Sequence, residues 1–309
     1  MKVDILTPIR FGGPQKWGDD LVRALKAERI EARNIHNLWG IIQRFFYTDA
    51  DVIHSTLPLT FNLQGKPIIL TIHGNLNIEK HPWSFMWSVA IKRANVITVP
   101  SEFLKKELGL KKAIAIPNGI FPEDYKPVKP RKKEVLQIVT VTGFKFWDKA
   151  RGVIELLKIL EEVKRKTKQK FDFTVVGGGP YLNKIKEESR KYDIPVKFIG
   201  FHPNPKEILQ KSDIFVYYSF QDNLPIAILE AMAYRLATLT NNCGAVRTII
   251  KNNYNGFISL NNPDFVNKLI YLMKNNKTRI RLGKKAMIVF KKFSWNKIIK
   301  NFIILYKNE

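Results

Sequence analysis

The 309-residue sequence lacks long uncharged apolar runs and contains a single cysteine, Cys243. One cysteine excludes an intramolecular disulfide and any cysteine-based zinc site, so we expect a reducing cytoplasm and a small packed side chain. No stretch approaches the roughly 18 apolar residues of a membrane-spanning helix, and residues 82–91, which come nearest, are too short. Asp4 falls where a signal peptide would begin its apolar run, so we expect no signal peptide.

Two common nucleotide-binding motifs are also missing. Residues 177–179 are glycines, but Leu182 stands where the dinucleotide fingerprint G-x-G-x-x-G needs its third glycine. No acidic residue follows at the distance needed to bind a ribose, and no G-x-x-x-x-G-K-[ST] sequence occurs. A dehydrogenase is therefore disfavoured, and a P-loop NTPase is excluded.

Acidic residues are scarce beside basic ones, at 27 against 52, which gives a formal charge of +25. Residues 1–128 carry 17 basic and 12 acidic side chains, whereas residues 129–309 carry 35 and 15. Such a charge attracts nucleic acid, anionic lipid or phosphorylated ligands. We give equal weight to a biased composition, since Lys, Ile and Asn are abundant throughout. No nucleic-acid recognition motif occurs, so nucleic acid is not an expected partner.

Short apolar runs alternate with amphipathic segments along the chain. The runs are rich in Val, Ile and Leu, as strands of a sheet covered on both faces require. Strand–helix alternation indicates parallel sheets with right-handed crossovers. The predicted strands are residues 3–7, 51–55, 67–72, 96–99, 136–142, 171–176, 196–199, 214–217 and 236–240. The predicted helices are residues 19–26, 151–167, 180–192, 205–211, 225–234 and 263–309, the last with a break at 292–295.

A stretch containing four prolines, from Pro117 to Pro130, interrupts the alternation. Neither a helix nor a central strand tolerates that spacing, so we place a linker near residues 125–134. The sequence therefore predicts two doubly wound domains, residues 1–127 and 128–292. A final helix, residues 293–309, is expected to return towards the first domain.

Residues that could bind a ligand follow several predicted strands, where open parallel sheets bind their ligands. Gly12 and Gly13 follow the first strand and allow close approach of a backbone, although an ordinary tight turn is an equal alternative. Lys145, Lys149 and Arg151 follow the strand at 136–142 and could neutralise a diphosphate. The alternative for these three cations is a solvated basic loop.

An acidic pair follows the strand at 214–217. Asp222 lies at the strand end, Pro225 suits the start of a helix, and Glu230 lies in that helix's second turn. The helix is otherwise apolar, so we expect Glu230 to be buried and to meet a polar partner.

Together these residues resemble the retaining, nucleotide-sugar-dependent glycosyltransferases of family 4. Their pattern, S-x-x-E-G-x-P-x-x-x-x-E-A-x-A, is similar to residues 219–233. Further similar segments follow the family's order along the chain, at residues 71–74, 116–120, 176–180, 245–247, 255–257 and 293–295. The resemblance implies the α/β GT-B fold, in which two Rossmann-like domains, a short acceptor domain and a nucleotide-sugar domain, face a cleft.

The resemblance also implies roles for individual residues. Glu230 would hold the donor ribose, Asp222 the donor sugar and Lys149 the diphosphate, with His73 near the sugar. An alternative for His73 is a strand-end histidine bonded to backbone. The other residues expected at the donor are Gly12, Gly13, Gly143, Lys145, Asn223, Leu224, Pro225 and Ile226.

The implied activity moves a hexose from a nucleotide sugar to a saccharide or lipid-linked saccharide, with no metal or other cofactor. A UDP-sugar is favoured over a GDP-sugar. Three departures from the family pattern are Asp222 for a glutamate, Phe144 for an arginine and Thr248 for a glutamate. Asp222 would alter which sugar is accepted, whereas Phe144 and Thr248 favour an alternative, a weak or inactive relative that binds a sugar nucleotide or acts as a scaffold.

Aromatic residues of the first domain also suggest a membrane contact. Residues 83–87 contain Trp83, Phe85, Met86 and Trp87 and precede Lys92 and Arg93, and residues 44–47 could extend the patch. Such a patch favours peripheral binding to anionic lipid at the inner face of the membrane. Core packing of these aromatics is the alternative.

Overall fold

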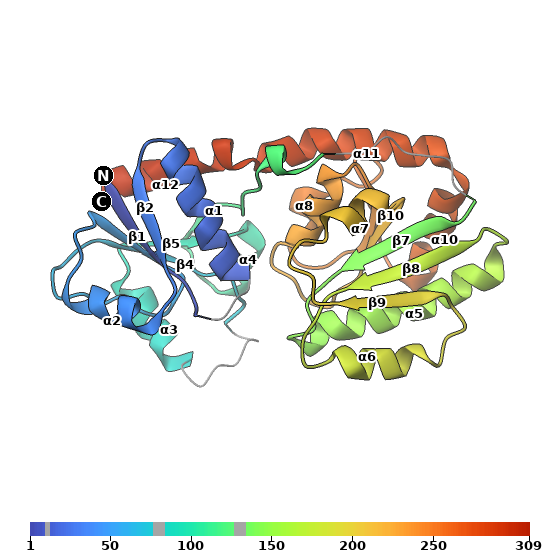
Figure 1. The fold of residues 1–309 in the computed structure, drawn as a ribbon, viewed down its shortest axis with the longest axis horizontal. Helices are drawn as coiled ribbons and strands as arrows, with labels where there is room; N and C mark the ends of the chain where they lie inside the picture. Colours follow the sequence, from blue (N-terminus) through green and yellow to red (C-terminus); the bar gives the residue numbers. More distant parts are fainter. Residues whose placement is uncertain (10–12, 77–83, 127–133) are drawn as a thin grey trace. The chain divides into compact units, whose positions relative to one another are not determined.

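The computed structural model describes residues 1–9, 13–76, 84–126 and 134–309 (Figure 1). They form two compact units. The first comprises Met1–Phe121 with Phe293–Glu309, and the second Pro122–Lys292. Most of the linker predicted at residues 125–134 lies outside the described residues.

The first unit contains a six-stranded parallel sheet in the order β2-β1-β3-β4-β5-β6. Its central strands are buried along almost their whole length, as expected for a sheet covered on both faces. The chain steps from β1 to β2 on one side and then to β3 on the other, so the topological switch point lies between β1 and β3. The strands are β1 Lys2–Leu6, β2 Glu31–Ile35, β3 Val52–Ser55, β4 Ile68–Thr71, β5 Val96–Val99 and β6 Ile114–Ala115.

Two helices of this unit begin at side-chain caps. The side chain of Asn37 accepts a hydrogen bond from the Gly40 amide at 2.6 Å, and that of Ser101 accepts one from the Leu104 amide at 3.1 Å. The helices are α1 Gly13–Ala27, α2 Leu38–Phe46, α3 Ser84–Arg93, α4 Glu102–Glu107 and α12 Trp295–Asn308.

The C-terminal helix α12 packs within the first unit. The Ile120 amide donates to the Phe293 carbonyl at 2.9 Å, and the Trp295 amide donates to the Ile120 carbonyl at 3.0 Å. The ring of Trp295 lies over Gly119, where a Cβ would come within 2.3 Å of it. Glycine is therefore required at this contact, because any side chain would displace the ring.

The second unit contains another six-stranded parallel sheet, in the order β12-β11-β10-β7-β8-β9. The chain moves outward from β7 through β8 and β9, then returns to β10 on the other side of β7. The switch point lies between β7 and β10. The strands are β7 Leu136–Val141, β8 Phe171–Val176, β9 Val196–Gly200, β10 Ile214–Tyr217, β11 Ala237–Asn241 and β12 Phe257–Ser259.

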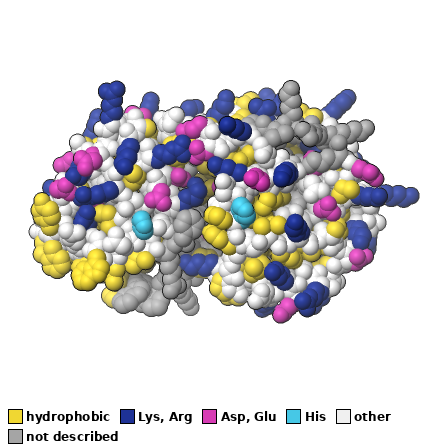
Figure 2. All heavy atoms as spheres, viewed as in Figure 1, with side chains coloured by type: hydrophobic (Ala, Val, Ile, Leu, Met, Phe, Trp, Pro, Cys, Tyr) yellow, Lys and Arg dark blue, Asp and Glu magenta, His cyan; other side chains and the backbone are white. Residues whose placement is uncertain are grey.

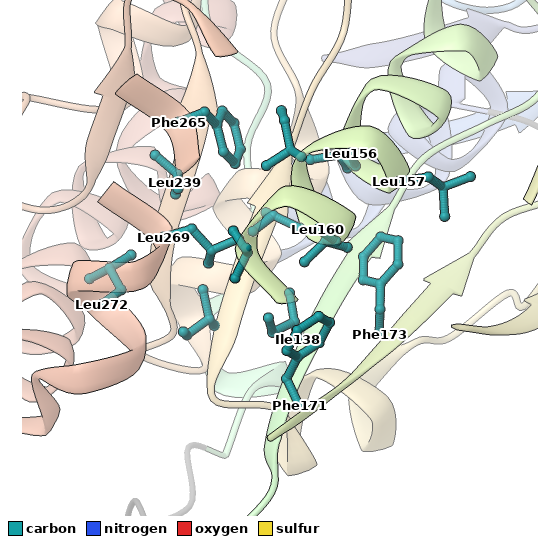
Figure 3. Packing of buried hydrophobic residues seen from close by; sticks show 14 of the residues in the cluster. Ile138, Leu156, Leu157, Leu160, Phe171, Phe173, Leu239, Phe265, Leu269 and Leu272 are labelled. Carbon is teal, nitrogen blue, oxygen red and sulfur yellow. The ribbon is translucent and has the colours of Figure 1, made fainter. Parts of the chain in front are cut away.

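A large apolar core lies between this sheet and the helices α5 and α10. Figure 3 shows Leu160 of α5 close to Phe173 of β8, and Leu156 of α5 on the side of Leu239 of β11 and Phe265 of α10. The helices are α5 Trp147–Lys166, α6 Leu182–Ser189, α7 Lys206–Lys211, α8 Ile226–Ala233, α9 Val246–Ile249, α10 Asn262–Lys274 and α11 Asn276–Phe290, with 3₁₀ turns at Pro122–Asp124 and Lys291–Phe293.

The two parallel sheets confirm the predicted fold class, and each strand predicted from the sequence is present. The first helix is longer than expected, since α1 begins at Gly13 instead of residue 19. The predicted C-terminal helical region has a second break, at Asn275 between α10 and α11. Strands β2, β6 and β12 were not predicted, because β2 is polar and the other two are very short.

Candidate functional site

Two of the predicted site residues meet at the switch point of the second sheet. Lys149 lies in the first turn of α5, just after β7, and Asp222 lies in the loop after β10. The Lys149 Nζ is 2.9 Å from Asp222 Oδ2. Because β7 and β10 are neighbours, residues far apart in sequence come together at the carboxyl edge of the sheet, where such sheets bind ligands.

The carboxylate of Asp222 is buried and has a second partner. The Tyr217 hydroxyl, at the end of β10, donates a hydrogen bond to the same oxygen, Oδ2. Burial, and then the charge of Asp222, raise the pKa of Tyr217 well above 10, so the hydroxyl stays protonated and can donate. A neutral donor and a cation thus compensate this buried charge, which would otherwise be costly.

Close backbone packing fixes the position of the Asp222 loop. Gly244 has a φ of +49°, and a Cβ there would lie 1.4 Å from the Asp222 carbonyl oxygen. Gly152 packs α5 against the Tyr218 carbonyl oxygen, which a Cβ would approach to 2.0 Å. Both contacts require glycine, so the backbones that carry Lys149 and Asp222 are held by shape as well as by charge.

Asn241, the last residue of β11, and Cys243, which follows the strand, lie beside the same loop. The Ser219 amide donates to Asn241 Oδ1 at 3.1 Å, and Asn241 Nδ2 donates to the Ser219 carbonyl at 2.7 Å. Burial, and then the Asp222 charge, raise the pKa of the Cys243 thiol to about 12. The thiol therefore stays protonated, and Cys243 is the small packed side chain that the sequence predicts.

The predicted donor-binding segment lies at the start of α8. Leu224 and Pro225 are buried. Ile226 begins the helix without a side-chain cap, and the Ile228 amide donates to the Pro225 carbonyl at 3.1 Å, so the amides of Ile226 and Ala227 are the ones that could meet a ligand. Asn223 is partly exposed beside them. An eight-residue helix that begins in this way presents partial positive charge at the same edge of the sheet as Lys149.

The expectation that Glu230 is buried is wrong. Ile226, Ala227 and Glu230 share the partly exposed face of α8, while Ile228 and Leu229 pack inward. Spacing of three and four residues places side chains on one helix face, which explains the exposure of Glu230 in an otherwise apolar helix. The carboxylate is therefore accessible to a ligand hydroxyl.

The loop after β7 contains two exposed residues, Gly143 and Lys145, on either side of the buried Phe144. Gly143 is open, since a Cβ there would meet no atom within 4 Å, and Lys145 is exposed. Phe144 is fully buried in the core, and its amide donates to the Gly178 carbonyl at 2.9 Å. Phe144, where the resemblance leads us to expect an arginine, thus packs beneath the glycine turn and supports the loop from inside.

Arg151 and Thr248, which the sequence analysis also names, contact residues close to them and not Asp222 in the contacts that follow. The Arg151 guanidinium lies 3.7 Å from the Phe220 ring centroid and 3.0 Å from Asp148 Oδ1. The exposed Thr248 hydroxyl donates to the Ala245 carbonyl within the short helix α9. Lys149 is therefore the cation that the structure places on Asp222.

Gly13 and His73 are the predicted site residues of the first unit that the structure describes. Gly13 begins α1 with open space around it, and His73 follows β4, where the Trp17 ring centroid lies 4.7 Å from that of His73. Burial lowers the pKa of His73 to about 4, so the ring is neutral near pH 7. Gly12 lies outside the described residues.

Sequence reasoning missed Tyr217, Asn241 and Gly244. Tyr217 ends an apolar strand run and is typical of core, while an asparagine and a glycine after a strand predict only a turn.

In the part of the chain that the structure describes, no group of three or more His, Cys, Asp or Glu side chains could hold a metal ion. Across the same residues, no helix is long and apolar enough to span a bilayer.

Sequence comparison places both halves of the chain in known families. Residues 123–288 match the family described as "Glycosyl transferases group 1", and residues 2–124 match "Glycosyltransferase Family 4". The chain is 24% identical over 282 residues to a trehalose synthase from Pyrococcus horikoshii, covering 83% of this chain and 66% of that one. It is 27% identical over 217 residues to the UDP-Gal:alpha-D-GlcNAc-diphosphoundecaprenol alpha-1,3-galactosyltransferase of Escherichia coli, covering 63% and 51%. The chain thus spans about half to two thirds of the length of these relatives.

Solved structures share the whole fold. A structure of Anabaena HepE in complex with UDP-glucose superimposes with a TM-score of 0.82 at 15% identity, covering 100% of both chains. Because the family model matches residues 123–288 and the structure contains two parallel sheets, the chain belongs to the family of glycosyl transferases group 1 and has the GT-B fold.

Proposed function

We propose that the protein is a retaining hexosyltransferase that uses a nucleotide-sugar donor without a metal ion. One observation carries the proposal: the ammonium of Lys149 meets the buried carboxylate of Asp222 at the switch point, beside the uncapped start of α8. A cation and free helix amides at one sheet edge suit a diphosphate. The family match supports glycosyl transfer as the activity of this site.

Each site residue has a role that follows from its charge and position. Lys149 and the first amides of α8 would face the diphosphate, Asp222 would accept hydrogen bonds from the donor sugar, and Glu230 would accept them from the ribose. During transfer, the bond from the anomeric carbon to the phosphate oxygen breaks, and its electron pair leaves with the diphosphate. The acceptor oxygen bonds to the same carbon, and its proton passes to an oxygen of the leaving diphosphate. Charge therefore develops beside Lys149, where a placed cation stabilises the transition state.

The names of related proteins support the finer parts of the proposal. HepE was solved with UDP-glucose, and the E. coli relative is named for UDP-Gal. That relative and one from Campylobacter jejuni are both named for diphosphoundecaprenol-linked sugars. We therefore favour a UDP-sugar as donor and a lipid-linked saccharide, or a free saccharide, as acceptor.

The test measures UDP release and the anomeric configuration of the product. Lys149→Ala should lower turnover by roughly 10²–10³-fold, as loss of one transition-state donor does elsewhere. Lys158→Ala is the matched control, because it removes one positive charge from an exposed turn of the same helix. Equal turnover in the two variants would refute the role of Lys149, and an inverted product would refute retention.

Phe144 favours a second candidate, a relative that binds the sugar nucleotide without turning it over. Its buried side chain leaves the loop after β7 without the arginine that the family has there. In that case UDP-sugars would stabilise the wild-type protein, and turnover would be as low in wild type as in Lys149→Ala.

A further inference from the structure

Exposed apolar side chains gather on one side of the first unit, over α2 and α3. Figure 2 shows hydrophobic side chains clustered in this region, at the lower left of the view. Trp39 is 82% exposed, Phe46 63% and Phe85 65%. We define the α2–α3 surface as six exposed apolar residues of this region: Trp39, Phe46, Tyr47, Phe61, Leu63 and Phe85.

Two contacts join the three segments of the α2–α3 surface. The Leu63 amide donates to the Phe45 carbonyl at 2.8 Å, which fixes the loop at residues 57–66 against the end of α2. The Arg93 guanidinium, at the end of α3, lies 5.6 Å from the Phe61 ring centroid. The loop therefore contacts both helices, and the exposed aromatics form one surface.

Helix α2 is apolar on both of its faces. Ile41 is buried and Phe45 packs beside it in the core, whereas Trp39 and Phe46, seven residues apart, share the outer face. An amphipathic surface helix would have polar residues on that outer face. Packing in the core therefore explains only about half of the apolar residues of α2. The exposed apolar residues on its outer face need a different explanation.

Helix α3 repeats this arrangement and corrects the patch predicted from the sequence. Trp87 packs against the core with the buried Ala90, as Phe45 does on α2, so neither Trp87 nor Phe45 belongs to the exposed surface. Phe85 and Val89, one turn apart, are its exposed apolar residues. Trp83 lies outside the described residues.

The charges on these segments have one sign. Residues 38–47, 57–66 and 84–93 contain no Asp or Glu. They contain Lys66, Lys92 and Arg93, of which Lys92 and Arg93 are exposed. Their other cation, Arg44, is bound to the buried Asp4, with Nε 2.8 Å from Oδ2.

This charge pattern decides between a second copy and a lipid surface. A two-fold dimer would press the same patch of each copy together, so cations would face cations across the interface. An anionic bilayer offers apolar depth to the aromatics and negative headgroups to the cations. The formal charge of +25 also opposes association of identical copies.

We propose that the α2–α3 surface docks the protein on an anionic lipid bilayer, with Trp39 and Phe46 entering the headgroup region and Lys66, Lys92 and Arg93 at its charged edge. The docking deepens the proposed function, because a lipid-linked acceptor would then be met at the bilayer. Only the identity of the acceptor rests on that function, since the docking surface lies entirely in the first unit and the donor residues Lys149 and Asp222 in the second.

The first test measures binding of the full chain to phosphatidylcholine vesicles with and without phosphatidylglycerol. Wild type should bind only the anionic vesicles. Replacing Lys66, Lys92 and Arg93 by glutamine should weaken binding by roughly 100-fold, at about fivefold for each cation near an anionic surface. Replacing Lys274, Lys277 and Lys284, exposed cations of the second unit, removes the same charge and should leave binding within about twofold of wild type.

Apolar variants test insertion separately from charge. The double variant Trp39→Ala, Phe46→Ala should lower binding at least about tenfold. Ile288→Ser, also an exposed apolar residue but on α11, should not lower it. Trp39→Phe should keep binding while reducing the quenching of tryptophan fluorescence by brominated lipid.

Several results would overturn the docking proposal: no binding of wild type to anionic vesicles, equal losses in the control and test variants, or a wild-type dimer that the Trp39→Ala, Phe46→Ala variant abolishes. A UDP-induced rise in melting temperature, retained in every variant, shows that the variants are folded. Loss of UDP binding with vesicle binding intact would refute the proposed function and leave the docking surface standing.

Discussion

The buried histidine His54 gives a pH dependence that can be worked out from its contacts. Its ring is fully buried in β3, with Nδ1 2.6 Å from Tyr306 Oη in α12 and Nε2 2.6 Å from Thr71 Oγ1 in β4. Burial, and then the nearby His73, lower the pKa of His54 from 6.5 to about 3. The ring is therefore neutral in the folded protein over the whole range in which a free histidine becomes charged.

The sign and size of the effect follow from linkage. Because the native state binds fewer protons than the unfolded state between the two pKa values, the free energy of unfolding falls as the pH drops below about 6.5. At about pH 5, the pH is about 1.5 units below the pKa of the ring in the unfolded state. The free energy of unfolding is then lower by about 2 kcal/mol than at neutral pH. The loss continues until the pH reaches the folded pKa.

The assay is urea unfolding followed by tryptophan fluorescence at about pH 7.5 and about pH 5. Five of the six tryptophans, all but Trp147, belong to the first unit, so the signal reports mainly on it. His54→Gln keeps an amide near Thr71 and Tyr306 but cannot titrate. Wild type should lose about 2 kcal/mol more than His54→Gln between the two pH values, and the exposed His36→Gln should behave as wild type. Equal losses of unfolding free energy in wild type and His54→Gln would refute the assignment of this pH dependence to His54.

Three further predictions concern single contacts. Gly244→Ala would place its Cβ 1.4 Å from the Asp222 carbonyl oxygen, so calorimetry should show UDP affinity reduced at least about tenfold; unchanged affinity would contradict this. Tyr217→Phe removes a hydrogen bond to a buried charge and should lower unfolding free energy by about 1.5–3 kcal/mol in urea titrations, and a neutral effect would count against the bond. Asp4→Asn leaves Arg44 without its buried carboxylate and should cost about 3 kcal/mol in the same assay; a stable variant would show that Arg44 finds another partner.

The fold was predictable wherever burial and composition agree. Strands such as β8 and β10 are short apolar runs, and their bounds match the prediction at both ends. Strand β2, with the sequence Glu-Ala-Arg-Asn-Ile, escaped prediction because it lies at the edge of the sheet and its Arg33 reaches Asp4 on β1. An ion pair between strands leaves no local pattern in either segment.

The site was predictable where a charged residue follows a strand. Lys149 and Asp222 were both found in that way, and the strand order explains why they meet. Tyr217 could not be found, because a tyrosine that ends an apolar strand is usually core. The partial exposure of Glu230 depends on how α8 is rotated against the sheet, which its apolar composition does not reveal.

The exposed surface of α2 shows a different limit. The sequence analysis predicts no helix over residues 38–46, and an apolar run there is usually core, yet Trp39 is 82% exposed. Which apolar residues stay outside is decided by the elements that cover a helix, and those are set by the tertiary fold.

The most direct test of the central claim is a crystal structure of the protein with UDP bound. We expect the diphosphate within roughly 3 Å of Lys149 Nζ and of the first amides of α8, and the ribose at Glu230. A nucleotide bound elsewhere, with Lys149 still paired to Asp222 and the start of α8 unoccupied by phosphate, would contradict it.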